Sequence, residues 1–281
     1  MQKKISTVTR SVIWEKQASL AVLDVSAVAA EAKRRHNLSP LATAAFARVI
    51  VCAAYLCSWI EEGQELSLVL GGEGPLGRIF AFGNGKLHLC GYVENPLAGE
   101  LGGDVAAKIR EAVGSSGSIT VTLDGGSGLP FSGSVCMTNG NISADMEEYF
   151  KVSEQRPTAI SLFEEERDGQ LLCGGVFVQP LTGAPPEIYQ RAQALAAECT
   201  SFSKTQVLLR EFIQHNGEVR EVSFACGCSR KKAENALLTV GFQAAMDCLR
   251  TEGAVVVHCP KCNGNYTFGE KEIRTLFRKE P

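Results

Sequence analysis

The chain has 281 residues, of which 45% are hydrophobic, and a formal net charge of −3 at pH 7. This length suffices for one large domain and one small one, and the hydrophobic share can supply a core. A weakly acidic chain carries no overall electrostatic signature of nucleic-acid binding. From Cys226 onward, however, nine Lys and Arg stand against six Asp and Glu, so that this segment alone is mildly basic.

The first ten residues are polar and lead directly into a strand-like stretch, Ile5 to Trp14, so no secretory leader is expected. Eleven cysteines without such a leader indicate reduced thiols and a cytoplasmic location. Asp24 then caps a predicted helix that ends near Asn37.

The segment Leu41 to Ile60 is almost continuously apolar and has the length of a membrane span. Arg48 lies near its middle, where a charge is costly in a bilayer. Ser39 and Pro40 precede it as a helix-capping and first-turn pair. We therefore predict a buried central helix of a protein that does not enter membranes.

A mainly β region follows. Asn84-Gly85 and Asp168-Gly169 each predict a turn between two strands. The glycine-rich run from Gly71 to Gly77 is interpreted as a turn, because it lacks the Lys-Ser/Thr of a phosphate-binding loop. Strands mixed with a few helices, without regular alternation, predict an α+β core domain. The predicted strands are 66–70, 78–82, 86–93, 118–123, 158–163 and 171–178.

Gly183-Ala184-Pro185-Pro186 interrupts any helix or central strand. Beyond it, Glu187–Cys199 and Thr205–Ile213 have short amphipathic patterns with weak apolar faces, which need another surface to be stable. We therefore predict three regions: a core substrate-binding domain (1–182), a metastable helical linker (183–220) and a small zinc-binding module (221–281).

Four cysteines in two close pairs provide the soft, charged ligands of a tetrahedral Zn²⁺ site. They are Cys226, Cys228, Cys259 and Cys262. A purely structural zinc site is one interpretation, but the single-residue spacer of the first pair is unusual for it and suggests a redox role. His258 is a weaker candidate as a further ligand. A zinc-deaminase site is excluded, because no His-x-Glu is present and four thiols close the coordination sphere.

The remaining cysteines mostly lie in apolar runs and are expected to be small core residues. They are Cys52, Cys57, Cys90, Cys136, Cys173, Cys199 and Cys248. The four histidines are scattered and no nucleophile motif surrounds them, so no catalytic triad is predicted and we expect no enzymatic activity.

The cysteine segments resemble the redox-switch module of the thirty-three-kilodalton heat-shock protein family, the redox-regulated holdase chaperones. The resemblance covers nearly the whole chain in order. The segments that carry it are Phe224–Arg230, Val257–Cys262 with Tyr266 and Phe268, Glu31–Pro40, Gly72–Gly77, Gly91–Pro96 and Tyr149–Gln155.

The resemblance implies that the four thiolates bind one Zn²⁺ in a reduced, inactive state. Oxidation would then form the disulfides Cys226–Cys228 and Cys259–Cys262, release zinc, unfold the module, loosen the linker and expose surface for unfolding client proteins. It further implies an active homodimer and transfer of clients to ATP-dependent foldase chaperones. Cys199 and Cys248 are additions to the family's pattern.

Two rival functions stay open on the sequence. A zinc-ribbon protein that binds nucleic acid is allowed by the mildly basic module, although we expect no nucleic-acid partner, since an aromatic and basic stacking surface is missing. A thiol-disulfide oxidoreductase using Cys259 and Cys262 lacks a thioredoxin-like context around the pair.

Overall fold

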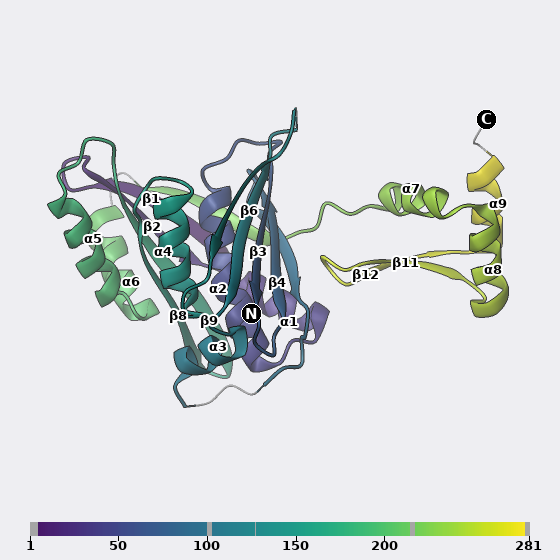
Figure 1. Cartoon of the computed structure of the whole chain (residues 1–281), viewed down its shortest axis with the longest axis horizontal. Helices are drawn as coiled ribbons and strands as arrows, with labels where there is room; N and C mark the ends of the chain where they lie inside the picture. Colours follow the sequence, from purple (N-terminus) through teal and green to yellow (C-terminus); the bar gives the residue numbers. More distant parts are fainter. Residues whose placement is uncertain (1–4, 100–102, 127, 214–216, 279–281) are drawn as a thin grey trace. The chain divides into compact units, whose positions relative to one another are not determined.

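Figure 1 shows the computed structural model, which describes residues 5–99, 103–126, 128–213 and 217–278. The chain divides into two compact units, one ending at Ala225 and one beginning at Cys226. The first unit combines one large sheet with helices, and the expected α+β class is confirmed.

The sheet of the first unit has ten strands in the order β7-β6-β3-β4-β5-β10-β1-β2-β9-β8. Neighbouring strands are antiparallel, except that β10 runs parallel to β5. The hairpins predicted at Asn84-Gly85 and Asp168-Gly169 are both present, and the glycine-rich run joins β3 to β4. The strands are β1 (Ser6–Ile13), β2 (Ala18–Asp24), β3 (Glu65–Gly72), β4 (Arg78–Asn84), β5 (His88–Val93), β6 (Gly117–Asp124), β7 (Phe131–Cys136), β8 (Ala159–Arg167), β9 (Gln170–Pro180) and β10 (Glu218–Phe224).

The central helix α2 (Pro40–Cys57) is buried from Leu41 to Cys57, as predicted. The Ser39 hydroxyl accepts a hydrogen bond from the Ala42 amide at 3.1 Å and so caps the helix. By length and composition alone α2 could cross a membrane, but 89% of that stretch is buried inside the fold. It packs against β3, β4 and β5 from one half of the sheet and against β2 and β9 from the other.

Arg48 of α2 is buried because a carboxylate compensates its charge. Its Nε and Nη2 donate to Glu164 Oε1 and Oε2 at 2.6 and 2.8 Å. The two side chains are only 9% and 4% exposed. A bidentate geometry of this kind is what allows a guanidinium to lie in an apolar core.

Helices cover both faces of one half of the sheet. Successive residues of a strand point to opposite faces, and in β2 Ala21 and Leu23 join the core around α2 while Leu20 and Val22 join a second core. The first core also takes side chains from α1 (Ser26–His36), α3 (Val105–Val113) and α4 (Ile142–Val152). The second is completed by α5 (Glu187–Glu198) and α6 (Phe202–Leu208), with a π-helical turn at Leu209–Ile213.

Strand β10 was not foreseen. It spans residues assigned from the sequence partly to the linker and partly to the zinc module, and it lies in the sheet of the first unit between β5 and β1. The sequence of β10 gives no clear strand signal, because it lacks the regular alternation of apolar and polar residues that marks a half-buried strand. In the structure, Val222 is the single buried residue of this strand.

The second unit is small. It contains a two-stranded β-hairpin and three helices, and six buried residues form its described hydrophobic core: Ala233, Leu237, Ala245, Val255, Phe268 and Ile273. Its elements are α7 (Arg230–Val240), α8 (Phe242–Glu252), β11 (Val255–Cys259), β12 (Gly264–Phe268) and α9 (Glu270–Arg278).

Candidate metal centre

Two short segments of the second unit carry the four predicted ligands. Cys226 and Cys228 lie on the stretch that precedes α7, where the Ser229 hydroxyl caps the helix by accepting from the Lys232 amide at 3.2 Å. Cys259 is the last residue of β11, and Cys262 lies in the turn before β12. In that turn Asn263 has a φ of 55°, a left-handed conformation that Asn tolerates better than most residues.

The four sulfur atoms converge. All four Sγ atoms lie within 4.8 Å of one another. Cys226 Sγ is 3.8 Å from Cys259 Sγ, and Cys228 Sγ is 3.5 Å from Cys262 Sγ. These contacts are far longer than the S–S bond of a disulfide, about 2.05 Å, and no disulfide joins these four cysteines in the described part of the chain.

The sulfur positions fit a tetrahedral metal. A Zn–S bond of about 2.3 Å in a regular tetrahedron separates neighbouring sulfurs by about 3.8 Å, which the two shortest contacts approach. Four thiolates form a closed coordination shell with no position for substrate, as in structural sites and unlike catalytic zinc. The cluster could therefore hold a metal ion.

Hydrogen bonds act on the thiol of Cys228. Burial alone raises its pKa, but the Tyr266 hydroxyl, which donates to its Sγ at 3.1 Å, and the neighbouring thiols lower the pKa of Cys228 to about 7. For Cys262, burial and the bond with Cys228 raise the pKa instead. One member of the cluster is thus poised to be a thiolate at neutral pH, the form that binds metal and reacts with oxidants.

Tyr266 is a residue whose role could not be read from the sequence. It lies on β12 opposite Val257 of β11, and this register brings its hydroxyl to the cluster. The sequence shows only that a tyrosine lies close to a pair of candidate ligands. The register of the hairpin is needed to show that its hydroxyl contacts the cluster.

The other candidate ligand does not join the cluster. The His258 ring is hydrogen-bonded through Nδ1 to Asn265 Oδ1 at 2.9 Å, and His258 is not among the clustered donors. Of the remaining cysteines, five are buried as expected, whereas Cys136 is exposed and Cys248 is half-buried. Burial raises the pKa of Cys57 to about 12 and that of Cys199 to about 11, so these thiols are protonated and unreactive.

Comparisons with known proteins agree with this geometry. A sequence model of the family described as Hsp33 protein matches residues 6–269. The chain is a member of the Hsp33 family. The 33 kDa chaperonin of Thermotoga maritima is 32% identical over 282 residues, covering 95% of both chains. The 33 kDa chaperonin of Desulforamulus reducens is 30% identical, covering 89% of both. The crystal structure of the Thermotoga maritima protein, titled a heat shock protein 33 homolog, superposes with a TM-score of 0.86 at 29% identity, over 98% of each chain.

Membership of the Hsp33 family settles the broad class of the protein. Hsp33 proteins are chaperones and not enzymes, and a chaperone has client proteins as partners. None of these relatives is described as a nucleic-acid-binding protein or as a thiol-disulfide oxidoreductase.

Proposed function

We propose that this Hsp33 protein is a redox-regulated, ATP-independent holdase whose switch is the four-cysteine cluster. The observation that carries the proposal is the convergence of four thiols, within 4.8 Å, in a unit whose described residues form a hydrophobic core of only six buried side chains. A unit with so small a core depends on a further stabilising element, and a metal bound by the thiols supplies it.

In the resting state, Cys226, Cys228, Cys259 and Cys262 would hold one Zn²⁺. The bound ion would keep the sulfurs deprotonated at neutral pH and contribute folding free energy. The Tyr266 hydroxyl supports this state, because a hydrogen bond to the Cys228 sulfur favours its thiolate.

In the activating step, a peroxide would oxidise two cysteine pairs. For each pair, two thiolates give up two electrons and one S–S bond forms, while hydrogen peroxide takes up these electrons and two protons from solution and is reduced to two molecules of water. The proposed pairs are Cys259–Cys262 and Cys226–Cys228. Because all four sulfur atoms lie within 4.8 Å of one another, the two sulfurs of each proposed pair are close enough to react with each other. Each disulfide removes two ligands, so the metal and the stability it confers are lost together.

Activation would expose the apolar surface that the linker helices α5 and α6 cover. Helix α5 buries Ile188, Ala192 and Ala196 in the core that it shares with β2 and β9. On the strand side this core contains Leu20, Val22, Ala159, Phe163, Val176 and Val178. If α5 and α6 undocked, this contiguous patch would become exposed, and such patches bind unfolded polypeptides.

The remaining parts of the proposal concern the regions and the partners. Residues 1–182 would bind clients, 183–220 would act as the linker and 221–281 as the switch, with β10 crossing the last boundary. The active form would be a homodimer in the cytoplasm, and it would pass clients to ATP-dependent foldases.

The deciding experiment is light scattering of a guanidinium-denatured client diluted into buffer. The protein is added either reduced and zinc-loaded or pre-oxidised with peroxide at elevated temperature. We expect suppression of aggregation by the oxidised form alone. Equal suppression by both forms would reduce the cysteine cluster to a structural site and refute the redox switch.

A further inference from the structure

Along the chain, β10 lies between the metal centre and the linker helices α5 and α6. The π-helical turn ends at Ile213, β10 runs from Glu218 to Phe224, and the first cysteine of the cluster follows after one residue. That residue, Ala225, donates its amide to the Leu89 carbonyl at 2.8 Å. A change that starts at Cys226 therefore meets the sheet at once, before it can reach α5 or α6.

The attachment of β10 to the sheet is weak on one side and largely polar. Five residue pairs join it to β1, from Ser6↔Val222 to Arg10↔Glu218, but two pairs join it to β5. Val222 is 3% exposed, whereas Val219 is 62% exposed. By comparison, six of the seven residues of β2 are buried. Since apolar burial is the main force that holds a strand in place, β10 is the least anchored inner strand by this measure.

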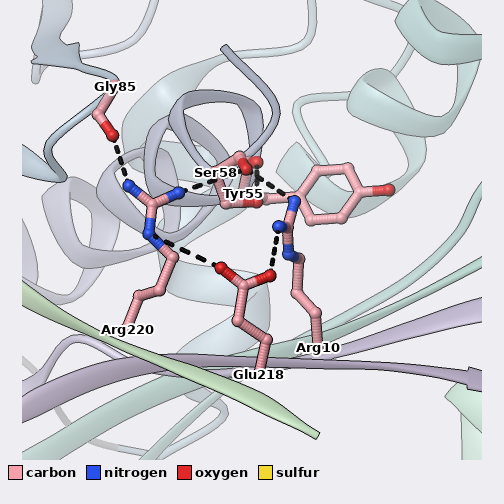
Figure 2. A network of polar contacts seen from close by, with 6 residues as sticks. All are labelled: Arg10, Tyr55, Ser58, Gly85, Glu218 and Arg220. Atoms are coloured by element: carbon pink, nitrogen blue, oxygen red, sulfur yellow. Dashed lines mark hydrogen bonds and ion pairs between the residues drawn. The ribbon is translucent and has the colours of Figure 1, made fainter. Parts of the chain in front are cut away.

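Polar contacts replace the missing burial at the first half of β10, in a group that we call the latch: Arg10, Glu218 and Arg220 (Figure 2). Arg10 Nη2 donates to Glu218 Oε2 at 2.7 Å and Nη1 donates to the Ser58 carbonyl at 2.6 Å. Arg220 donates to the Gly85 carbonyl, and at 3.4 Å to the Ser58 carbonyl.

The latch reaches the carboxyl end of the central helix. Ser58 is the C-cap of α2, where carbonyl groups have no helical partner and the helix dipole is negative, so two guanidinium groups are favourable there. The hydrogen bond from Arg10 also lowers the pKa of Glu218. Contacts of this kind are easily exchanged for water, because the latch side chains are between 19% and 55% exposed.

We propose that β10 is a displaceable strand, and that the slot it leaves between β1 and β5 takes an extended segment of an unfolding polypeptide. This inference rests on the proposed holdase function and assigns a docking surface to it. The slot is already filled by an extended segment, β10, whose backbone pairs with β1 and β5. Backbone pairing of this kind does not depend on the sequence of the added strand. Unfolded chains present such segments in abundance.

The slot nevertheless has a side-chain preference. Val222 joins the core around α2, and Phe224 packs against that core with the Arg35 guanidinium 5.1 Å from its ring centroid. Removal of Glu218 would leave Arg10 without its carboxylate. A favoured client segment therefore runs antiparallel to β1 with an acidic residue opposite Arg10, and has apolar residues four and six positions later.

The test is amide hydrogen exchange on the full chain in three states: reduced and zinc-loaded, oxidised, and oxidised with guanidinium-denatured malate dehydrogenase. We expect residues 6–10 of β1 and 219–225 around β10 to lose protection together on oxidation. On addition of the client, residues 6–10 should regain protection while 219–225 stay unprotected, because another chain then fills the slot.

Three outcomes would overturn the inference. Residues 219–225 could stay protected after oxidation, so that the slot never opens. Residues 6–10 could stay unprotected with client. Both segments could regain protection without client as protein concentration rises, which would mean that a second copy's β10 fills the slot. If the oxidised protein still suppresses aggregation in these cases, the proposal that clients bind in the slot is wrong but the holdase function stands. If the oxidised protein does not suppress aggregation and residues 6–10 stay unprotected, the proposed holdase function is wrong as well.

A pair of variants isolates the latch in the reduced state. Arg220→Gln removes a charged donor from two carbonyls, and we expect exchange at residues 6–10 and 219–225 to become about tenfold faster. Arg78→Gln is the matched control, because its partner Glu94 lies in an exposed ion pair of the same sheet, away from the slot. Equal exchange in both variants would show that the latch does not hold β10.

Discussion

Replacing Cys259 by serine tests the metal centre most directly. The substitution exchanges a soft sulfur for a hydroxyl at a position 3.8 Å from the Cys226 sulfur and leaves three thiols in the cluster. A hydroxyl is a poor zinc ligand at neutral pH, because it stays protonated. We therefore expect tight zinc binding to be lost and the second unit to be unfolded even under reducing conditions.

The magnitude follows from the size of the second unit. Structural zinc contributes about 10–16 kcal/mol to small modules, which exceeds the net stability of many whole domains, about 5–15 kcal/mol. An equal share for one ligand is about 3 kcal/mol, or a loss of more than 100-fold in metal affinity. With six buried residues among those described, the core of the second unit is small, so this unit is expected to depend on the metal for its stability.

The assay combines zinc stoichiometry, measured with a chromogenic chelator, and limited proteolysis mapped by mass spectrometry. Cleavage should concentrate between residues 226 and 278 and spare the sheet of the first unit. Cys248→Ser is the matched control, because Cys248 is half-buried in the same small unit but lies outside the cluster. Stoichiometric zinc and a protease-resistant second unit in Cys259→Ser would refute the ligand assignment.

Three further substitutions test other parts of the structure. Ala192→Glu places a charge in the fully buried face of α5 and should give client binding without oxidation in the light-scattering assay, whereas Ala194→Glu on the exposed face should not. Tyr266→Phe removes one of the hydrogen bonds that, together with those of the neighbouring thiols, lower the pKa of Cys228 to about 7. The thiolate's contribution is complete above pH 9 and is lost as pH falls through 7, so without the donor the pH midpoint of zinc release, followed by the chelator, should rise by about one unit. Glu164→Gln leaves a buried guanidinium uncompensated and should lower the free energy of unfolding in urea by about 3–5 kcal/mol; a loss below about 1 kcal/mol would contradict the burial of this pair.

The parts of the fold that could be predicted depend on local signals. Ser39 and Pro40 define the start of α2, and the Asn84-Gly85 and Asp168-Gly169 turns define two hairpins, because capping and turn conformations are properties of a few neighbouring residues. The four thiols could be found for the same reason, since each pair is close in sequence. The prediction that all four thiols form one site then needed a single further assumption, that the two pairs lie close together in the fold.

The parts that could not be predicted depend on contacts distant in sequence. Strand β10 exists because Arg10 and Leu89, from β1 and β5, provide its partners, and its own residues alternate too weakly to indicate a half-buried strand. The hydroxyl of Tyr266 acquires its role only through the register of β11 and β12. Both cases are ones in which pairing partners, and not intrinsic propensity, determine the structure.

The position of β10 also constrains how the linker can respond to the metal centre. The linker helices are connected to the sheet at both ends, by β9, which ends at Pro180, and by β10, which begins at Glu218. While β10 stays docked, α5 and α6 form a loop closed on the sheet, and undocking them gains only the limited entropy of a tethered loop. Release of β10 frees one end, and the gain in entropy on undocking becomes larger. Unfolding of the second unit and undocking of the helices are therefore expected to be coupled through β10. Strengthening β10 by Glu221→Val, at an exposed position of the strand, should raise the oxidant exposure needed for activity in the light-scattering assay.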